Sequence, residues 1–153
     1  MTHKTSYFYI LLLTLFIVSC SKDSTEGPYV NTPTASPLQI PQLFQDLILD
    51  PVMPSNNPQA EEGVFLGKKL FFDPILSADN TLACAGCHGV PNAFSDNTRF
   101  SDGVDGIFGR RNAMPLFNLA WNYDNKFFWD GRDSGLENQA FEPITNPIEM
   151  HTT

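Results

Sequence analysis

Three residues that can carry metal or redox chemistry stand together near the middle of the chain. They are Cys84, Cys87 and His88, in the pattern Cys84-Ala85-Gly86-Cys87-His88. Residues three and four apart share one face of a helical turn, so the two thiols and the imidazole can converge on one object. This is the spacing at which a c-type haem is attached through two thioether bonds, with the histidine as iron ligand. The motif therefore predicts haem c on Cys84 and Cys87, with His88 as its axial ligand.

Two other chemistries use paired cysteines, and the sequence favours neither of them. A zinc site normally needs a second pair of ligands, and the other histidines, His3 and His151, lie near the two ends of the chain. A thioredoxin-like pair belongs in a βαβ pattern, whereas residues 89–92 have the composition of a loop. Haem attachment is therefore the better prediction.

The first 19 residues predict a lipoprotein signal peptide. A short polar start with Lys4 precedes an uncharged run from Ser6 to Ser19, which is too short to span a bilayer comfortably. The run ends in Ile17-Val18-Ser19-Cys20, which is similar to the lipobox of bacterial lipoproteins, where the cysteine is acylated. We expect Cys20 to become a lipid anchor that holds the protein on a membrane, on the periplasmic side of the cell envelope. The alternative is that Cys20 is a lone buried cysteine.

Charge and cysteine usage narrow the choice of partners. Lipid at Cys20 and haem at the other two cysteines account for all three thiols, so no structural disulfide is expected. The formal net charge is -8, and removal of residues 1–19 takes away one lysine and makes it -9. An acidic surface repels nucleic acid and favours a small basic redox protein as electron donor.

Composition divides the rest of the chain into a tether and a domain. Residues 20–37 are rich in Ser, Thr and Pro and lack an apolar period, which predicts a flexible tether. Residues 38–153 show helical apolar spacing but no run of alternating strands, so we expect one all-α domain with long loops.

Four segments of that domain are expected to be helical. One lies within residues 38–49, and its apolar side chains share a face: Leu43, Phe44, Leu47 and Ile48. The next is expected to begin at Asn57-Pro58, with Asn57 as its cap, and to end at Asp73-Pro74. Its apolar face comprises Val64, Gly67, Leu70 and Phe71, with Gly67 allowing a close approach.

The second half of the domain is expected to contain less regular structure. Residues 93–111 are polar and glycine-rich, which predicts a long loop over the haem edge. A short helix is expected over residues 113–121, and another over residues 135–142 that Pro143 and Pro147 would end.

Four stretches of the chain, within about residues 52 to 151, resemble the bacterial di-haem cytochrome c peroxidase family, which includes enzymes similar to the tryptophan-tryptophylquinone maturase. The spacing from Trp129 to Glu149 matches the family without a gap, which is far more specific than the haem motif alone. The matching residues are Leu66-Gly67-Lys68-Lys69-Leu70-Phe71-Phe72-Asp73-Pro74; Cys84 to His88; Arg111-Asn112; and Phe128-Trp129-Asp130-Gly131-Arg132 with Leu136, Gln139, Pro143, Ile144, Glu149 and Met150.

The resemblance implies a cytochrome c-like haem domain and a role for several side chains. Gln139 and Glu149 would be the polar pair on the distal side of a haem that reduces hydrogen peroxide. Trp129 would lie between two haems and assist electron transfer, and Asn112 would be a side-chain ligand of a calcium ion. A homodimer of the full-length protein is also implied. From residue types alone, Glu149 could instead be a solvated carboxylate, Gln139 an exposed helix residue and Trp129 part of a core.

The chemistry of these side chains suits the implied roles. Peroxide cleavage needs a proton moved from one oxygen to the other, and a positioned carboxylate such as Glu149 can make both transfers. The amide of Gln139 can donate and accept hydrogen bonds to hold peroxide without changing its own charge.

Two departures from the family pattern matter. Many members carry a histidine, in the loop before Arg-Asn, that caps the resting peroxidatic haem. Its place falls near Val104 here, and no histidine lies between His88 and His151, so we expect a haem that is open on its distal side. The family also has two haem domains, whereas this chain has one C-x-x-C-H motif. We therefore expect a truncated fragment, in which residues 38–153 are the N-terminal haem domain and the second haem is absent. The alternative is that another chain supplies the second half.

Two other functions stay open. A mono-haem electron carrier would use Met114 or Met150 as sixth iron ligand, and a thioether there would raise the reduction potential. A haem-based sensor or binding module would need only an open site.

Overall fold

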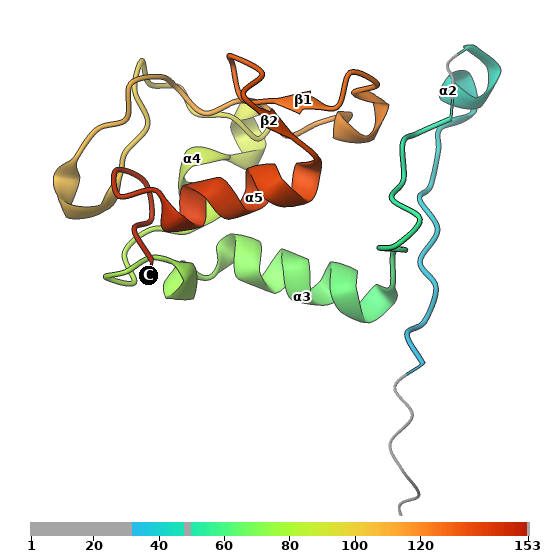
Figure 1. Cartoon of the computed structure of the whole chain (residues 1–153), viewed down its shortest axis with the longest axis horizontal. Coiled ribbons are helices and arrows are strands. Elements are labelled where there is room, and N and C mark those ends of the chain that lie inside the picture. The colour runs from blue at the N-terminus through green and yellow to red at the C-terminus, as the bar shows by residue number, and fades with distance from the viewer. Residues whose placement is uncertain (1–31, 48–49, 153) are drawn as a thin grey trace, which may run out of the picture. The chain divides into compact units, whose positions relative to one another are not determined.

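The computed structural model describes residues 32–47 and 50–152 (Figure 1). Its elements belong to one unit, Pro33–Thr153. The predicted signal segment, Cys20, most of the tether and Ile48 lie outside the described residues. In the part that is described, no helix is both long enough and apolar enough to cross a bilayer.

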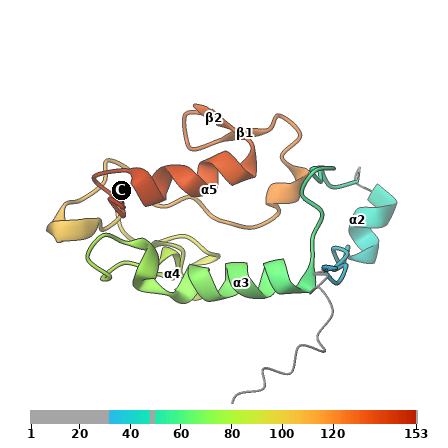
Figure 2. The same cartoon turned by 60° about the horizontal axis from the view of Figure 1, so that its bottom comes forward.

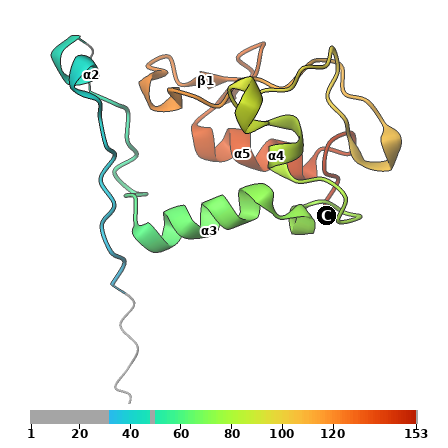
Figure 3. The same ribbon diagram turned by 180° about the vertical axis from the view of Figure 1, so that it is seen from behind.

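Two helices dominate the described unit. Helix α3 (Glu61–Phe72) and helix α5 (Leu136–Thr145) run alongside each other in all three ribbon views (Figures 1, 2 and 3). The single turn α4 (Cys84–Cys87) packs against α3, and α2 (Gln42–Leu47) precedes both. Short 3₁₀ turns occupy Pro74–Leu76, Val90–Asn92, Val104–Gly106 and Leu119–Trp121.

The expectation of an all-α domain is met only in part, because the chain also forms a small antiparallel hairpin. Strand β1 (Lys126–Phe127) pairs with β2 (Asp133–Ser134), with Lys126 opposite Ser134 and Phe127 opposite Asp133. Gly131 has a φ of +65° in the connection, a conformation that glycine adopts without steric cost. Strands of two residues are too short to produce an alternating pattern, so sequence periodicity does not reveal them.

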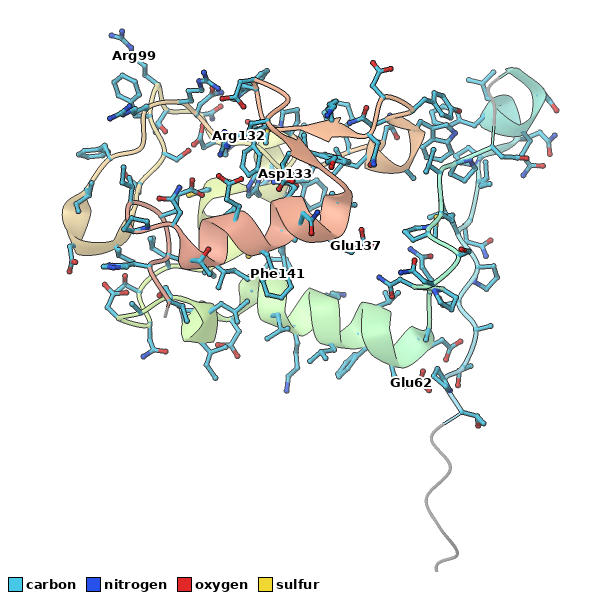
Figure 4. All side chains as sticks on the ribbon, viewed as in Figure 1. Glu62, Arg99, Arg132, Asp133, Glu137 and Phe141 are labelled. Atoms are coloured by element: carbon cyan, nitrogen blue, oxygen red, sulfur yellow. The ribbon has the colours of Figure 1, made fainter. Side chains whose placement is uncertain are left out.

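Helix α3 begins three residues after the predicted Pro58, and Asn57 does not cap it. The residue at the cap position is Ala60, which pairs with Ala35 in an isolated β-bridge. The amide of Glu61 donates to the carbonyl of Thr34 at 2.8 Å, and the Glu62 carboxylate, at the start of α3 in Figure 4, accepts from the Thr34 amide and hydroxyl. This tertiary pairing holds residues 59–61 near the extended segment and sets the first turn, and Asn57 donates to Glu137 instead.

The predicted end of α3 is correct, but its predicted close-approach face is not. The helix stops at Asp73, whose carboxylate accepts from the amide of Ile75 and starts the next turn. Leu70 and Phe71 are half-buried, whereas Val64 is 50% exposed. A methyl group at Gly67 would meet nothing within 4 Å, so this glycine permits no close approach among the described residues.

Helix α5 continues past Pro143, which was predicted to end it. Proline cannot donate a backbone hydrogen bond, so the helix lacks the bond that residue 143 would otherwise donate to the carbonyl of Gln139. The helix closes instead at Asn146, whose amide donates to the carbonyl of Glu142 at 2.9 Å.

The segment 113–121 is mostly irregular rather than helical, with one 3₁₀ turn at Leu119–Trp121. Trp121 meets Phe44 of α2 edge to face, with ring centroids 5.0 Å apart. Leu43 of the predicted apolar face of α2 is 62% exposed. The contact with Trp121 therefore buries only part of that face.

The buried residues of the described part are few and lie mainly around the second half of the chain. They are Gly103, Val104, Ala113, Phe127 and Met150, with the polar Ser77 and Gln139. Three of them, Ala113, Gln139 and Met150, also line the central cavity. Part of the buried surface of this unit therefore faces the cavity.

Candidate haem site

A cavity of ≈ 700 Å³ lies between α4, the 101–119 segment and α5. This volume falls within the range of small-molecule and cofactor sites. Its apolar lining includes Phe71, Leu82, Leu116 and Ile144. A hydrophobic wall with a few polar groups is the environment that a porphyrin needs.

The two cysteines and the histidine of the motif all line this cavity. Both thiols are free and half-buried. Burial raises the pKa of the Cys84 thiol, and burial together with the nearby Asp96, Asp102 and Glu149 carboxylates raises the pKa of Cys87 to about 11. Reactive redox thiolates have lowered pKa values, so this pair differs from a thioredoxin-like centre.

The orientation of His88 is fixed by a backbone carbonyl. His88 ends α4, and its Nδ1 atom lies 2.9 Å from the carbonyl oxygen of Phe94. A carbonyl only accepts, so Nδ1 carries the proton and Nε2 keeps its lone pair. Ala93 and Phe94 both have φ of +56°, and this tight turn brings the carbonyl to the imidazole. The side chains present therefore fit a covalently attached haem whose iron is bound by Nε2 of His88.

The two polar residues expected on the distal side reach the same cavity. Gln139 on α5 is 7% exposed, and Glu149 follows α5 and is half-buried. Burial raises the pKa of Glu149; Arg132 opposes that shift and Glu142 adds to it. Gln139 is thus not an exposed helix residue, and Glu149 is not a fully solvated carboxylate.

Trp129 stands at the edge of the cavity and is 56% exposed, so it is not part of a core. Its indole N–H donates to the backbone carbonyl of Asn112 at 3.0 Å. That bond links the residue proposed for electron transfer to the residue expected to bind calcium. The described residues contain no group of three or more His, Cys, Asp or Glu side chains that could hold a metal ion.

Three further residues singled out in the sequence lie in or near the cavity. Met114 and Met150 both line the cavity. Val104, which stands where many family members have a histidine, is 2% exposed, and its amide donates to the carbonyl of Glu149 at 2.9 Å. Among the described cavity-lining residues, His88 is the only histidine.

Sequence reasoning missed the charged network beside Glu149. Arg132, above α5 in Figure 4, pairs with Asp130 at 3.1 Å and with Glu142 at 2.9 Å, and its guanidinium lies 3.6 Å from the centroid of the Phe128 ring. Arg111 joins the same Asp130 at 3.2 Å. These pairs tie the β1–β2 connection to α5 and to the preceding loop. The Phe128-Trp129-Asp130-Gly131-Arg132 run was the available signal, but the ion pairs depend on the fold.

Comparison with known proteins identifies the family. Residues 61–153 match the family model for di-haem cytochrome c peroxidase, which covers more than half of the chain. The chain belongs to the di-haem cytochrome c peroxidase family. The matched segment contains the haem-attachment motif, Trp129, Gln139 and Glu149.

Curated members of this family resemble the chain over about two thirds of its length. It is 45% identical over 96 residues to cytochrome c551 peroxidase of Pseudomonas aeruginosa and 43% identical over 98 residues to cytochrome c peroxidase Ccp of Escherichia coli. It is 44% identical over 98 residues to the methylamine utilization protein MauG of Methylorubrum extorquens. These matches cover 63%, 64% and 64% of this chain but 27%, 21% and 27% of the relatives. The chain therefore spans about a quarter of the length of these proteins.

Solved structures agree with the sequence matches. A crystal structure of a MauG-like protein associated with microbial copper homeostasis superposes with a TM-score of 0.67 at 33% identity, over 78% of this chain and 33% of that one. The di-haem peroxidase BthA of Burkholderia thailandensis gives a TM-score of 0.56 at 29% identity, over 69% of this chain and 30% of that one. The described unit thus has the fold of part of a di-haem peroxidase.

Proposed function

We propose that this chain supplies the peroxide-reducing haem site of a cytochrome c peroxidase. The observation that carries the proposal is that Gln139 and Glu149 reach the same cavity as Cys84, Cys87 and His88. Family membership supports it as well. The haem would supply the iron at which hydrogen peroxide binds and is reduced, with two electrons from a redox protein.

The side chains around the cavity divide the remaining work. Cys84 and Cys87 would hold the cofactor, and His88 would bind its iron. The buried amide of Gln139 holds peroxide through hydrogen bonds. Glu149 takes a proton from one peroxide oxygen and returns it to the other, which then leaves as water.

Burial suits Glu149 to this exchange. A carboxylate in water is a weak base, and burial raises the pKa of Glu149, which makes it a stronger one. Arg132 opposes that rise. Glu149 can therefore both accept a proton and give it back.

The proposal also includes a source of electrons and a location at a membrane. Trp129 would pass electrons from a second haem that lies outside residues 38–153, and that haem would be reduced by a small basic redox protein. Lipid on Cys20 would hold the enzyme at the periplasmic face of a membrane. Calcium at Asn112 and a homodimer of the full-length protein rest on family resemblance alone.

A mono-haem electron carrier is the second candidate, because Met114 and Met150 line the same cavity. The optical spectrum of the ferric, haem-loaded protein separates the two functions. A high-spin spectrum, with hydrogen peroxide consumed when a reduced cytochrome is supplied, supports the peroxidase. A low-spin, methionine-ligated spectrum that peroxide leaves unchanged contradicts it and supports the carrier.

A further inference from the structure

Asn146, which closes α5, uses its side chain and its backbone to hold the segment that carries Glu149. Its Oδ1 atom accepts from the amide of Ile148 at 3.0 Å, and its Nδ2 atom donates to Oε1 of Glu149 at 3.1 Å. Its backbone carbonyl accepts from the amides of Glu149 and His151, each at 3.0 Å. Four hydrogen bonds thus join one residue to the turn that enters the cavity.

The chemistry of these bonds settles which end of the amide faces Glu149. A backbone N–H can only donate, so the atom of Asn146 beside the amide of Ile148 must be the oxygen. The NH₂ group therefore points to the carboxylate. That group is a donor in every protonation state, so it favours a Glu149 oxygen that carries no proton.

The backbone of Glu149 is also held by a second segment. Its carbonyl accepts from the buried Val104 at 2.9 Å. Gly103 packs so closely that an added methyl group would overlap the carbonyl of Ile148. Because the backbone is fixed between two segments, the remaining freedom of Glu149 lies in its side chain.

Other charged groups surround Glu149 but do not hold its carboxylate by hydrogen bonds. The guanidinium of Arg132, in the β1–β2 connection, forms ion pairs with Asp130 and Glu142. Glu142 on α5 acts on Glu149 through its charge, and the Cys87 thiol on α4 is uncharged, with a pKa raised to about 11. Within the described residues, Asn146 is the side chain bonded to this carboxylate.

We propose that Asn146 is a positioning residue for Glu149: its amide holds Oε1 and leaves Oε2 as the oxygen that exchanges protons with peroxide. This inference rests on the proposed function. Without the amide, the Glu149 side chain can rotate, and the proton no longer leaves from one fixed place. Misplacement of a catalytic group by about 1 Å can cost about a hundredfold in rate.

Asn146→Asp tests the bond to Glu149 separately from the bond that holds the turn after α5. Aspartate keeps an acceptor for the amide of Ile148 but removes the donor to Glu149. Asn146→Ser also keeps a short acceptor and cannot reach Glu149, so it provides a second variant of different charge. Asn138→Asp is the matched control, because Asn138 lies on the same helix, bonds only to the carbonyl of Ser134 and does not line the cavity.

The test is the reaction of the haem-loaded, full-length protein with hydrogen peroxide. We expect both Asn146 variants to lower the rate at saturating peroxide by about 10- to 100-fold. The half-saturating peroxide concentration should stay within about twofold, since Gln139 holds peroxide. Asn138→Asp should react as the unaltered protein does, and the haem spectrum should match in all variants.

A double-mutant cycle distinguishes positioning from a general structural effect. If Asn146 acts through Glu149, Asn146→Asp should slow the reaction little further once Glu149→Gln is present. If Asn146→Asp slows the reaction equally with Glu149 and with Glu149→Gln, the inference is overturned. It is also overturned if Asn146→Asp reacts as fast as Asn138→Asp while Glu149→Gln reacts slowly. If Glu149→Gln itself reacts at the unaltered rate, the acid–base role in the proposed function fails too.

Discussion

The Nδ1 atom of His88 lies 2.9 Å from the carbonyl oxygen of Phe94, and this contact decides which imidazole nitrogen is left for iron. The carbonyl reaches His88 because Ala93 and Phe94 both adopt the left-handed region. Two consecutive non-glycine residues in this region are costly, so the turn is sensitive to the side chain at position 93.

Ala93→Val should therefore lower the free energy of unfolding by about 1 to 2 kcal/mol, because a β-branched side chain tolerates a positive φ poorly. Ala93→Gly is the matched control and should show no such loss, since glycine adopts this conformation freely. Chemical denaturation of the haem-loaded protein measures both. Equal stability of the valine and glycine variants would contradict the described turn.

Covalent haem attachment predicts a simple extraction result. When the protein is expressed with a haem-attachment system, one haem per chain should survive acid-acetone extraction at this motif. Replacing both Cys84 and Cys87 with alanine should release all of it, because only the ligand bond from His88 would remain. Extractable haem in the unaltered motif would rule out thioether bonds.

The haem motif and the presence of α5 were readable from sequence because they depend on local spacing, although α5 ends at Thr145 rather than before Pro143. Cys84, Cys87 and His88 reach one cavity because a single helical turn places them on one face, as the motif predicts. The start of α3 was not readable, because Thr34 fixes it from 27 residues earlier than Glu61 in the chain. The side-chain bond from Asn146 to Glu149 also requires the turn after α5, which no apolar period indicates. Sequence thus identified residues that line one cavity, but not the contacts that orient them.

Gly103 should be intolerant of any side chain. A methyl group there would overlap the carbonyl of Ile148, in the turn that carries Glu149. We expect Gly103→Ala to lower the free energy of unfolding by about 1 to 3 kcal/mol, because neither the backbone at residue 103 nor that at Ile148 can move away easily.

Gly109→Ala is the control in the same loop, since its added methyl group would make ordinary contacts of 3.5 and 3.6 Å. It should change stability by less than about 0.5 kcal/mol. Urea denaturation compares the two variants. Similar values for both would show that the loop is not held against Ile148.

The raised pKa of Glu149 predicts how stability depends on pH. In the folded state burial favours the protonated form, so Glu149 stabilises the fold at pH values below its unfolded pKa. That contribution disappears as the pH rises through the higher folded pKa. Glu149→Gln cannot ionise and should therefore be more stable than the unaltered protein at neutral pH.

The stability difference should shrink as the pH falls below the usual range of a glutamate. Thermal unfolding across this pH range measures it, and Glu137→Gln is a control because hydrogen bonding lowers the pKa of Glu137 instead. The control should be less stable than the unaltered protein at neutral pH. The same pH dependence in both variants would contradict the assignment to Glu149.

The same Glu149→Gln substitution should slow peroxide chemistry. A general acid–base group contributes about 10²- to 10⁴-fold, or roughly 3 to 5 kcal/mol of barrier. We therefore expect oxidation of the haem by hydrogen peroxide to slow by at least about a hundredfold, with the haem spectrum unchanged. Gln139→Leu should have a smaller effect, because it removes polar support but no proton carrier. Stopped-flow mixing of the full-length protein with peroxide measures both, and a Glu149→Gln rate equal to the unaltered one would assign the proton transfer to another group, such as Glu142.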